Sequence, residues 1–309
     1  MCVLQSIEEL SEISGPIFLA IGAFDGVHLG HKAVIERALS DAKRADGTAV
    51  AVTFDPHPAR VLRPERAPRL LTATKHKLQL IENLGVTHTL VIGFTSEFAA
   101  TPPEKFVEQL HACCKPLREI CVGHEWSFGR NRAGNLALLK HMGDELGFEE
   151  VGVPAVQVNG EIVSSTLIRA AVETGDLTRA KLFLGRNYSI LGTVVRGDGL
   201  GRGLGFPTAN LSAHNEQFPP NGVYAVEAQL GGRALQGVVN IGVRPTIQSA
   251  TGERVLELHL LDFDEDIYGE DIEVFFRKFL RAEQKFSGLE ELKNQIERDV
   301  VAARTISEQ

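Results

Sequence analysis

Short runs of consecutive apolar residues constrain the fold of the first half of this chain. The runs lack polar alternation and lie at residues 16–21, 48–54, 89–93 and 119–123. Stretches with helix-like spacing of apolar residues separate them. A strand carries such a run when both of its faces are buried, as in a parallel sheet with helices on both sides. The first half is therefore predicted to be a doubly wound α/β domain.

Beyond about residue 184 the pattern changes. Strand-like segments follow one another without long helices between them, and Gly and Pro punctuate them, at residues 188–196, 222–230, 234–241, 254–263 and 272–276. This succession is typical of an antiparallel barrel or sandwich. One amphipathic helix from about Gly288 closes the chain. We predict two domains of different class, residues 1–184 and 185–309.

Composition narrows the classes of function. The 309-residue chain has a formal net charge of −8, which argues against a protein that coats nucleic acid but allows a local basic site for a small anion. No run approaches the ~18 apolar residues needed to span a bilayer, and the first ten residues are acidic, whereas a signal peptide begins basic. The four cysteines form no CxxC pair. We expect a cytoplasmic protein without nucleic-acid or membrane partners; the oligomeric state stays open.

A glycine-rich loop joins the first apolar run to the first predicted helix. Residues 22–31 read GAFDGVHLGH. Glycines let backbone approach a phosphate, a helix N-terminus favours an anion, and His28 and His31 can both hydrogen-bond it. The loop is neither the dinucleotide fingerprint nor a Walker A loop, and its HxxH spacing lacks a third zinc ligand. The plain alternative is a turn with two incidental histidines.

Two further segments carry chemistry-bearing residues. Residues 54–58, FDPHP, end the second strand, and their prolines direct His57 to the edge where strand C-termini gather. Residues 163–169, VSSTLIR, combine helix-capping hydroxyls with Arg169 one turn later, which can form a phosphate clamp. The plain alternatives are a rigid loop with a surface histidine and an ordinary helix cap.

Together the three segments resemble the HxGH-type nucleotidyltransferases, and FDPHP is similar to the N-terminal domain of bacterial FAD synthetases. The resemblance implies a Rossmann-like domain in which the phosphate of FMN attacks the α-phosphate of ATP directly and pyrophosphate leaves. It implies that His28 and His31 are catalytic and stabilise the α- and β-phosphates. The ATP-binding residues that it implies are Gly22, Phe24, Asp25, His28, His31, Ser164, Ser165, Thr166 and Arg169.

The resemblance also implies a flavin side of this site, at His57, Glu125 and Phe128. Residues 123–129, GHEWSFG, match the family's GxDFxFG-like segment, but Glu125 and Trp126 stand where a shorter Asp or Asn and a Phe are usual. Core packing is the alternative for Phe128. The departure motivates a rival function, a monofunctional riboflavin kinase with an inactive first domain.

The second half contains a second glycine-rich segment. Residues 196–205, RGDGLGRGLG, can fold around phosphates as a nest of N–H groups or form an ordinary surface loop. The next residues, FPTANL at 206–211, complete a stretch similar to the GxxLGFPTANL signature of riboflavin kinases. More of that family's pattern follows in order, at residues 220–225, 239–246, 256–260, 267–269 and 280–286.

By this second resemblance, the barrel domain is a riboflavin kinase. Thr208 and Asn210 would hold Mg²⁺, and Glu257 would be the general base that takes the proton of the riboflavin 5′-hydroxyl. Independently, period-2 alternation places Glu257 and His259 on one strand face. The remaining implied contacts are ATP phosphates at Gly201, Gly203, Gly205, Thr208 and Asn210, and flavin at Arg281 and Glu283. An ion pair with Glu283 is the plain alternative for Arg281.

The chain thus resembles a bifunctional bacterial FAD synthetase over nearly its whole length. We expect the C-terminal domain to convert riboflavin and ATP to FMN and ADP, and the N-terminal domain to join FMN to AMP from a second ATP. The expected partners are riboflavin, FMN and ATP, with Mg²⁺ as cofactor. The alternative outside enzymes is a flavin-binding or regulatory protein that keeps both folds.

Overall fold

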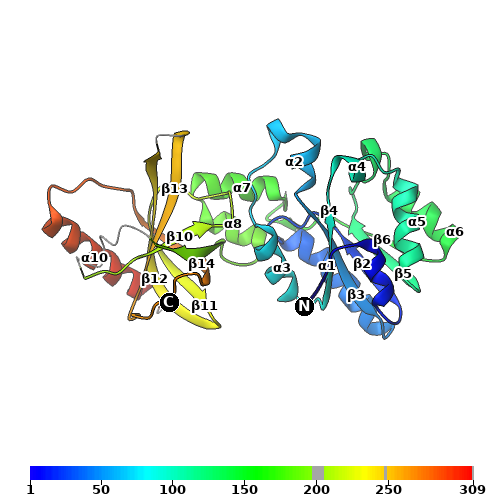
Figure 1. Cartoon of the computed structure of the whole chain (residues 1–309), viewed down its shortest axis with the longest axis horizontal. Coiled ribbons are helices and arrows are strands. Elements are labelled where there is room, and N and C mark those ends of the chain that lie inside the picture. Colours follow the sequence, from blue (N-terminus) through cyan, green and yellow to red (C-terminus); the bar gives the residue numbers. More distant parts are fainter. Residues whose placement is uncertain (197–204, 247–248, 308–309) are drawn as a thin grey trace. The chain divides into compact units, whose positions relative to one another are not determined.

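The computed structural model describes residues 1–196, 205–246 and 249–307 (Figure 1). Contacts divide the chain into two compact units. Residues 1–69 and 74–165 make up the first, and residues 70–73 and 166–309 make up the second. The chain therefore enters the second unit for four residues long before its second half begins. Among the residues described, no helix is both long and apolar enough to cross a lipid bilayer.

The first unit is built on a six-stranded sheet in which every pairing is parallel. The strand order is β1-β4-β3-β2-β5-β6. The strands are β1 (Cys2–Leu4), β2 (Ile17–Ile21), β3 (Thr48–Asp55), β4 (His88–Gly93), β5 (Leu117–Gly123) and β6 (Glu149–Val153). The predicted doubly wound sheet is confirmed, and its order reverses at β2, which lies between β3 and β5.

Helices cover both faces of this sheet. Ile17, Leu19 and Ile21 of β2 pack in one apolar cluster with α5 and α6, whereas the alternate residues Phe18 and Ala20 pack in another with α1 and α3. The helices and short segments of this half are η1 (Ile7–Glu12), α1 (Leu29–Arg44), α2 (Pro58–Leu62), η2 (Pro64–Arg66), α3 (Thr74–Glu82), α4 (Ser96–Ala99), α5 (Pro103–Cys113), η3 (Arg130–Arg132), α6 (Leu136–Leu146), β7 (Gln157–Val158) and β8 (Glu161–Ile162). A strand with two buried faces explains the absence of polar alternation.

The second unit contains a closed barrel in which every pairing is antiparallel. The order is β10-β13-β12-β11-β14-β9, and β9 pairs with both β10 and β14, which closes the barrel. The strands are β9 (Ser189–Val195), β10 (Ala209–Ala213), β11 (Gly222–Leu230), β12 (Arg233–Thr246), β13 (Ser249–Leu260) and β14 (Asp271–Arg281). The predicted barrel is confirmed, and closure decides between barrel and sandwich.

Among the residues that the structure describes, three helices accompany the barrel: α7 (Ser165–Thr174), α8 (Leu177–Leu184) and α10 (Leu289–Ser307). The C-terminal helix α10 packs Val300 and Ala303 against Val223 and Val238 of the barrel. The boundary predicted between residues 184 and 185 falls at the end of α8. This boundary stays a prediction. The contacts within the chain divide it differently, since they group residues 166–184 with the second unit.

A buried cluster of acids lies between α1 and β5 in the first unit. Glu119 and Asp41 are 3% and 5% exposed, and Asp41 pairs with Arg37 and Arg44. The Cys121 thiol donates a hydrogen bond to Glu119 Oε1 at 2.8 Å. Burial raises the pKa of Glu119. Burial also acts to raise the pKa of Asp41, but hydrogen bonds from Arg37 and Glu119 hold it below its usual range. Of the two carboxyl groups, Glu119 is therefore the one that keeps its proton to the higher pH.

We expect Glu119→Gln to change how stability depends on pH. A carboxyl whose pKa is raised by folding contributes stability that is fully present below its unfolded pKa and is lost as pH rises through the folded pKa. The free energy of unfolding of the wild type should fall as pH rises above the ordinary glutamate value of 4.5. Urea denaturation across pH should show this component absent in the Gln variant. The exposed Glu149, which pairs with Glu119 in register, provides the control Glu149→Gln; equal pH slopes in all three proteins would contradict the assignment.

A buried ion pair fastens α10 to the barrel. Arg281 Nε lies 3.1 and 3.0 Å from the two carboxylate oxygens of Asp299, and the two side chains are 15% and 6% exposed. On the same helix, Arg304 pairs with Asp262, whose side chain is 73% exposed.

Asp299→Asn should destabilise the protein by about 3 kcal/mol, because removal of one partner strands the other charge in a buried place. Asp262→Asn breaks an exposed pair and should change stability little. Thermal unfolding of both variants tests this contrast. A similar shift of the unfolding temperature in both variants would show that the buried Arg281–Asp299 pair stabilises the protein no more than the exposed pair does.

Candidate active sites

A cavity of about 490 Å³ opens at the carboxyl ends of β2, β5 and β6 in the first unit. This is the point where the strand order of the sheet reverses, and ligands bind in the crevice outside such a point. Its lining residues are Ile21, Gly22, Ala23, Phe24, His28, Gly30, His31, Val34, Gly123, His124, Glu125, Trp126, Val153, Pro154, Ala155, Val156 and Val163. Five predicted site residues belong to this set: Gly22, Phe24, His28 and His31 from the segment after β2, and Glu125 from the loop after β5.

The two predicted histidines meet at the N-terminus of α1. His28 is the N-cap residue, and its Nδ1 accepts a hydrogen bond from the His31 backbone N–H at 3.3 Å. The two rings stack with centroids 3.5 Å apart and an interplanar angle of 17°. A Cβ on Gly30 would lie 3.1 Å from His28 Cε1, so glycine leaves room for the ring. Two imidazoles thus share the cavity with a helix N-terminus, which favours anions.

The loop between β2 and α1 has an unusual backbone. Phe24 and Val27 adopt positive φ angles of 50° and 38°, a region that L-residues rarely occupy. Phe24 is buried, and its ring meets His31 edge-on with centroids 5.4 Å apart. A Cβ on Gly22 would lie 2.7 Å from that ring. Gly22 and Phe24 therefore shape the loop that presents the histidines.

The serine-rich segment contributes to the same loop. Ser165 Oγ donates a hydrogen bond to the carbonyl oxygen of the buried Asp25 at 3.0 Å. Ser164 precedes it and is half-buried. Thr166 and Arg169 follow on α7 and belong to the second unit, where Thr166 is exposed and Arg169 half-buried. The structure thus joins Ser165 to the histidine loop by a direct contact.

The predicted flavin residues separate into two groups. Glu125 is exposed and lines the cavity beside Trp126. Phe128 is buried behind this wall, where it stacks on Trp126 with centroids 4.4 Å apart and packs on Phe106. His57 caps α2 by accepting a hydrogen bond from the Ala59 N–H at 3.2 Å, and neither His57 nor Phe128 lines the cavity. Their flavin roles stay predictions.

Sequence reasoning missed a buried lysine beside this loop. Lys77 on α3 is 5% exposed, and its Nζ donates hydrogen bonds to the Phe54 and Ala23 carbonyl oxygens at 3.1 and 3.3 Å. Burial lowers the pKa of Lys77 to about 8, against the opposing charges of Asp25 and Asp55. A signal was present, because Leu80 and Ile81 follow Lys77 at i+3 and i+4 and place it on the buried helix face.

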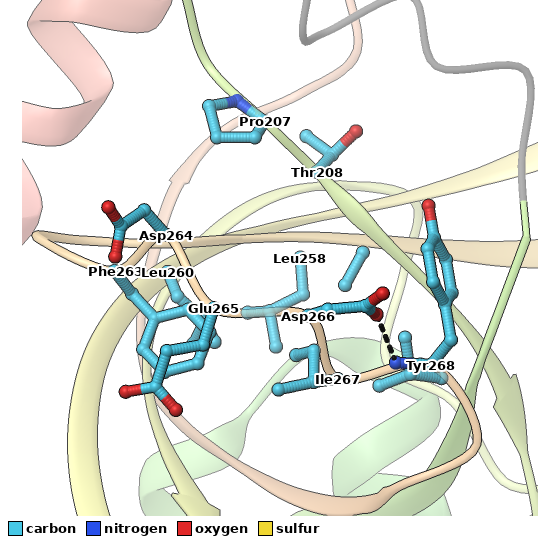
Figure 2. A pocket seen from close by; sticks show the side chains of 12 residues that line it. Pro207, Thr208, Leu258, Leu260, Phe263, Asp264, Glu265, Asp266, Ile267 and Tyr268 are labelled. Atoms are coloured by element: carbon cyan, nitrogen blue, oxygen red, sulfur yellow. Dashed lines mark hydrogen bonds between the residues drawn. The ribbon is translucent and has the colours of Figure 1, made fainter.

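A second cavity, of about 380 Å³, opens in the barrel unit. Leu258, Leu260 and Ile267 give it apolar walls, and Thr208 brings a hydroxyl to it. Figure 2 shows Pro207 and Thr208 beside the loop that carries Asp264–Tyr268, in which the Tyr268 N–H donates to Asp266 Oδ1 at 3.1 Å. The remaining lining residues are Val194, Ala209, Phe263, Asp264 and Glu265.

Three polar residues form a row across neighbouring barrel strands. Glu257 on β13 lies opposite Asn210 on β10 and opposite Asn240 on β12. Directly opposed residues of antiparallel strands point to the same face. All three are half-buried, while the flanking Leu256 and Leu258 are fully buried on the other face. Asn240 is a second residue that sequence reasoning missed, because only the strand register places it beside Glu257.

The start of β10 is held by a histidine. His259 Nδ1 hydrogen-bonds the Pro207 carbonyl oxygen at 2.8 Å, and its ring meets Phe206 edge-on. This contact fixes the segment that carries Thr208. Gly205 has a φ of 87°, which favours glycine. The predicted phosphate contacts Gly201 and Gly203 lie outside the described residues.

The two predicted flavin residues of the barrel have other partners. Arg281 binds Asp299, so the alternative of an Arg281–Glu283 ion pair is wrong. Glu283 Oε2 accepts a hydrogen bond from Asn221 Nδ2 at 3.3 Å. Its Oε1 lies 2.7 Å from the position of a Cβ on Gly242, so a side chain there would displace the flexible end of Glu283. Contacts to flavin by Arg281 and Glu283 stay predictions.

Comparison with known proteins assigns a family to each half. A family model described as riboflavin kinase matches residues 184–307, and one described as FAD synthetase matches residues 10–167. The bifunctional riboflavin kinase/FMN adenylyltransferase of Escherichia coli (strain K12) is 38% identical over 306 residues, which cover 98% of this chain and 97% of that protein. The protein of the same name from Bacillus subtilis (strain 168) is 37% identical over 286 residues, 91% of this chain and 89% of that protein.

A solved structure is similar over the whole chain. It is described as a macrolide-efflux protein from Streptococcus pneumoniae, is 26% identical, and superposes with a TM-score of 0.84. The match covers 98% of this chain and 99% of the other. It supports the same succession of folds.

Proposed function

Because the chain belongs to the family of bifunctional riboflavin kinase/FMN adenylyltransferases, we propose that it makes FAD in two ATP-dependent steps. The barrel unit transfers the γ-phosphoryl group of ATP to the 5′-hydroxyl of riboflavin and yields FMN, ADP and a proton. The first unit then joins FMN to the AMP part of a second ATP and releases pyrophosphate. The observation that carries this proposal is that each unit, of a different fold, has its own set of polar residues: the histidine loop at the cavity of the first unit, and in the barrel the row of Asn210, Glu257 and Asn240 together with a cavity that Thr208 lines.

In the adenylyl-transfer step, a phosphate oxygen of FMN attacks the α-phosphorus of ATP and the bond to the β-phosphate oxygen breaks. Negative charge grows on the phosphoryl oxygens, and preorganised donors stabilise it. His28 and His31 at the N-terminus of α1 supply such donors. Ser164, Thr166 and Arg169 would bind the departing pyrophosphate, while Ser165 holds the loop through Asp25.

In the kinase step, Glu257 would accept the proton of the riboflavin hydroxyl as that oxygen attacks the γ-phosphorus. Asn210 and Asn240 flank it on the two neighbouring strands. The Thr208 hydroxyl and the Asn210 amide oxygen would hold Mg²⁺, since Mg²⁺ prefers oxygen ligands and leans on substrate phosphates. When bound, the ion neutralises charge on the phosphates. The cavity beside Thr208, with its apolar wall of Leu258, Leu260 and Ile267, would take the nucleoside part of ATP.

We also propose that both reactions take place in the cytoplasm, with riboflavin, FMN and ATP as the partners of the protein. The four cysteines are free thiols, which fits a reducing compartment. Burial raises the pKa of the Cys114 thiol to about 12, so this cysteine is unreactive.

The monofunctional alternative rests on Glu125 and Trp126. Both line the first cavity, which has a volume of about 490 Å³ with them in place. Relatives that align over both halves are named as bifunctional enzymes. These observations favour two active sites.

Substitution of one residue in each unit should separate the two activities. His28→Ala should lower conversion of FMN to FAD by about 10²–10³-fold, because a transition-state donor is lost, and leave riboflavin phosphorylation unchanged. Glu257→Gln should do the reverse and lower phosphorylation by about 10²–10⁴-fold. Chromatography of flavins over time, with riboflavin or FMN as the starting substrate, measures both. FMN that accumulates in the wild type and is never converted would support the monofunctional alternative.

Asn240→Ala should weaken only the kinase step. Loss of one hydrogen bond near the reacting hydroxyl should lower kcat/KM for riboflavin about tenfold and leave FAD formation from FMN unchanged. Gln236→Ala is the matched control, because Gln236 is an exposed residue on the same strand and face. Identical kinetics in the two variants would exclude Asn240 from the site.

A further inference from the structure

We infer that Lys77 is a positioning residue for adenylyl transfer, which holds the histidine loop against the end of the neighbouring strand. The inference rests on the adenylyl-transfer activity proposed above. Lys77 does not line the cavity, whereas Ala23, to which it is hydrogen-bonded, does. It therefore acts through the loop and not on the reacting groups.

The contacts of Lys77 join two strand ends. Its Nζ donates to the Ala23 carbonyl, just after β2, and to the Phe54 carbonyl, at the penultimate residue of β3. Thr53 Oγ1 of β3 donates to the same Ala23 oxygen at 3.1 Å. The loop that carries His28 is thus tied to β3 by two side chains at one carbonyl group. These two donors satisfy a backbone acceptor that the protein shields in part from water.

The loop needs this support because its backbone is strained. Phe24 and Val27 both hold positive φ angles without being glycine. Residues in such regions persist only where their surroundings over-determine them. Three successive carbonyl groups are engaged: Ala23 by Lys77 and Thr53, Phe24 by the Val27 N–H at 3.1 Å, and Asp25 by Ser165. Removal of Lys77 leaves the strained turn with one fewer constraint directly before the histidines.

The charge of Lys77 makes its two hydrogen bonds, to the Ala23 and Phe54 carbonyl groups, dependent on pH. These two hydrogen bonds are called the Lys77 clamp below. The charged groups that act on Lys77 are Asp25 from the histidine loop and Asp55 from the end of β3, and burial lowers its pKa to about 8. An ammonium group donates three hydrogen bonds, and the neutral amine donates fewer and weaker ones. The Lys77 clamp is complete below this pKa and weakens as pH rises through it. FAD formation should therefore decline on the alkaline side.

The test compares Lys77→Met, Lys77→Arg and the control Lys75→Met in the full-length protein. Lys75 is an exposed lysine on the same helix. For FMN and ATP as substrates, Lys77→Met should lower kcat by about 10–100-fold, with a much smaller change in KM for ATP, because misplacement of catalytic groups affects the transition state most. Riboflavin phosphorylation by the same preparation should stay at the wild-type rate. Lys75→Met should match the wild type in both reactions.

The pH profile separates positioning from a purely structural role. Lys77→Arg should recover part of the lost kcat, and its alkaline decline should shift to higher pH, since a guanidinium keeps its proton. Wild-type kcat in Lys77→Met, or an unshifted decline in Lys77→Arg, would overturn the inference. If Lys77→Met does not fold, the pH dependence of kcat in Lys77→Arg is by itself the test of the inference. A wild type that phosphorylates riboflavin but never forms FAD would refute the proposed adenylyl transfer itself, a result distinct from either of these.

Discussion

The first site depends on how the chain leaves β2. The strand is buried on both faces and stands where the sheet order reverses, so its C-terminal end faces a crevice that no neighbouring connection fills. The loop that follows must turn sharply into α1 while its carbonyl groups remain bonded. Lys77, Thr53 and Ser165 provide those bonds from three other segments of the chain. Only then do two imidazoles and a helix N-terminus converge on one cavity.

The second site depends on closure of the barrel. Because β9 pairs with both β10 and β14, each of the six described barrel strands has a neighbour on both sides, and these neighbours fix its register. Register in turn decides which side chains share a face. Asn210, Glu257 and Asn240 form one row for this reason, although they come from three different strands.

The buried ionisable side chains discussed above each lie beside a polar or oppositely charged partner. That partner determines whether the side chain shifts its pKa, ties two elements together or supports a loop. Against the opposing effect of burial, hydrogen bonds from its neighbours hold the pKa of Asp41 below its usual range, whereas burial raises the pKa of Glu119 beside it. Asp299 neutralises Arg281 and ties α10 to the barrel. Lys77 is matched by two carbonyl oxygens and by the charges of two aspartates beside the histidine loop. A buried ion without such partners would be strongly destabilising.

The amino-acid sequence alone determined the classes of the two halves, because apolar runs, alternation and turn residues are local consequences of burial. The family resemblance added both activities, and the family models confirm it over residues 10–167 and 184–307. The histidine loop and the Thr208–Asn210 segment were predictable because each is contiguous in the chain.

Only the tertiary structure decided which distant residues meet. It paired Arg281 with Asp299 and not with Glu283, brought Asn240 beside Glu257, and placed Lys77 on the carbonyl groups of two strands. Periodicity shows which face of an element is buried. It does not show which atom of another segment lies there, because strand register and helix packing arise from contacts across the whole unit.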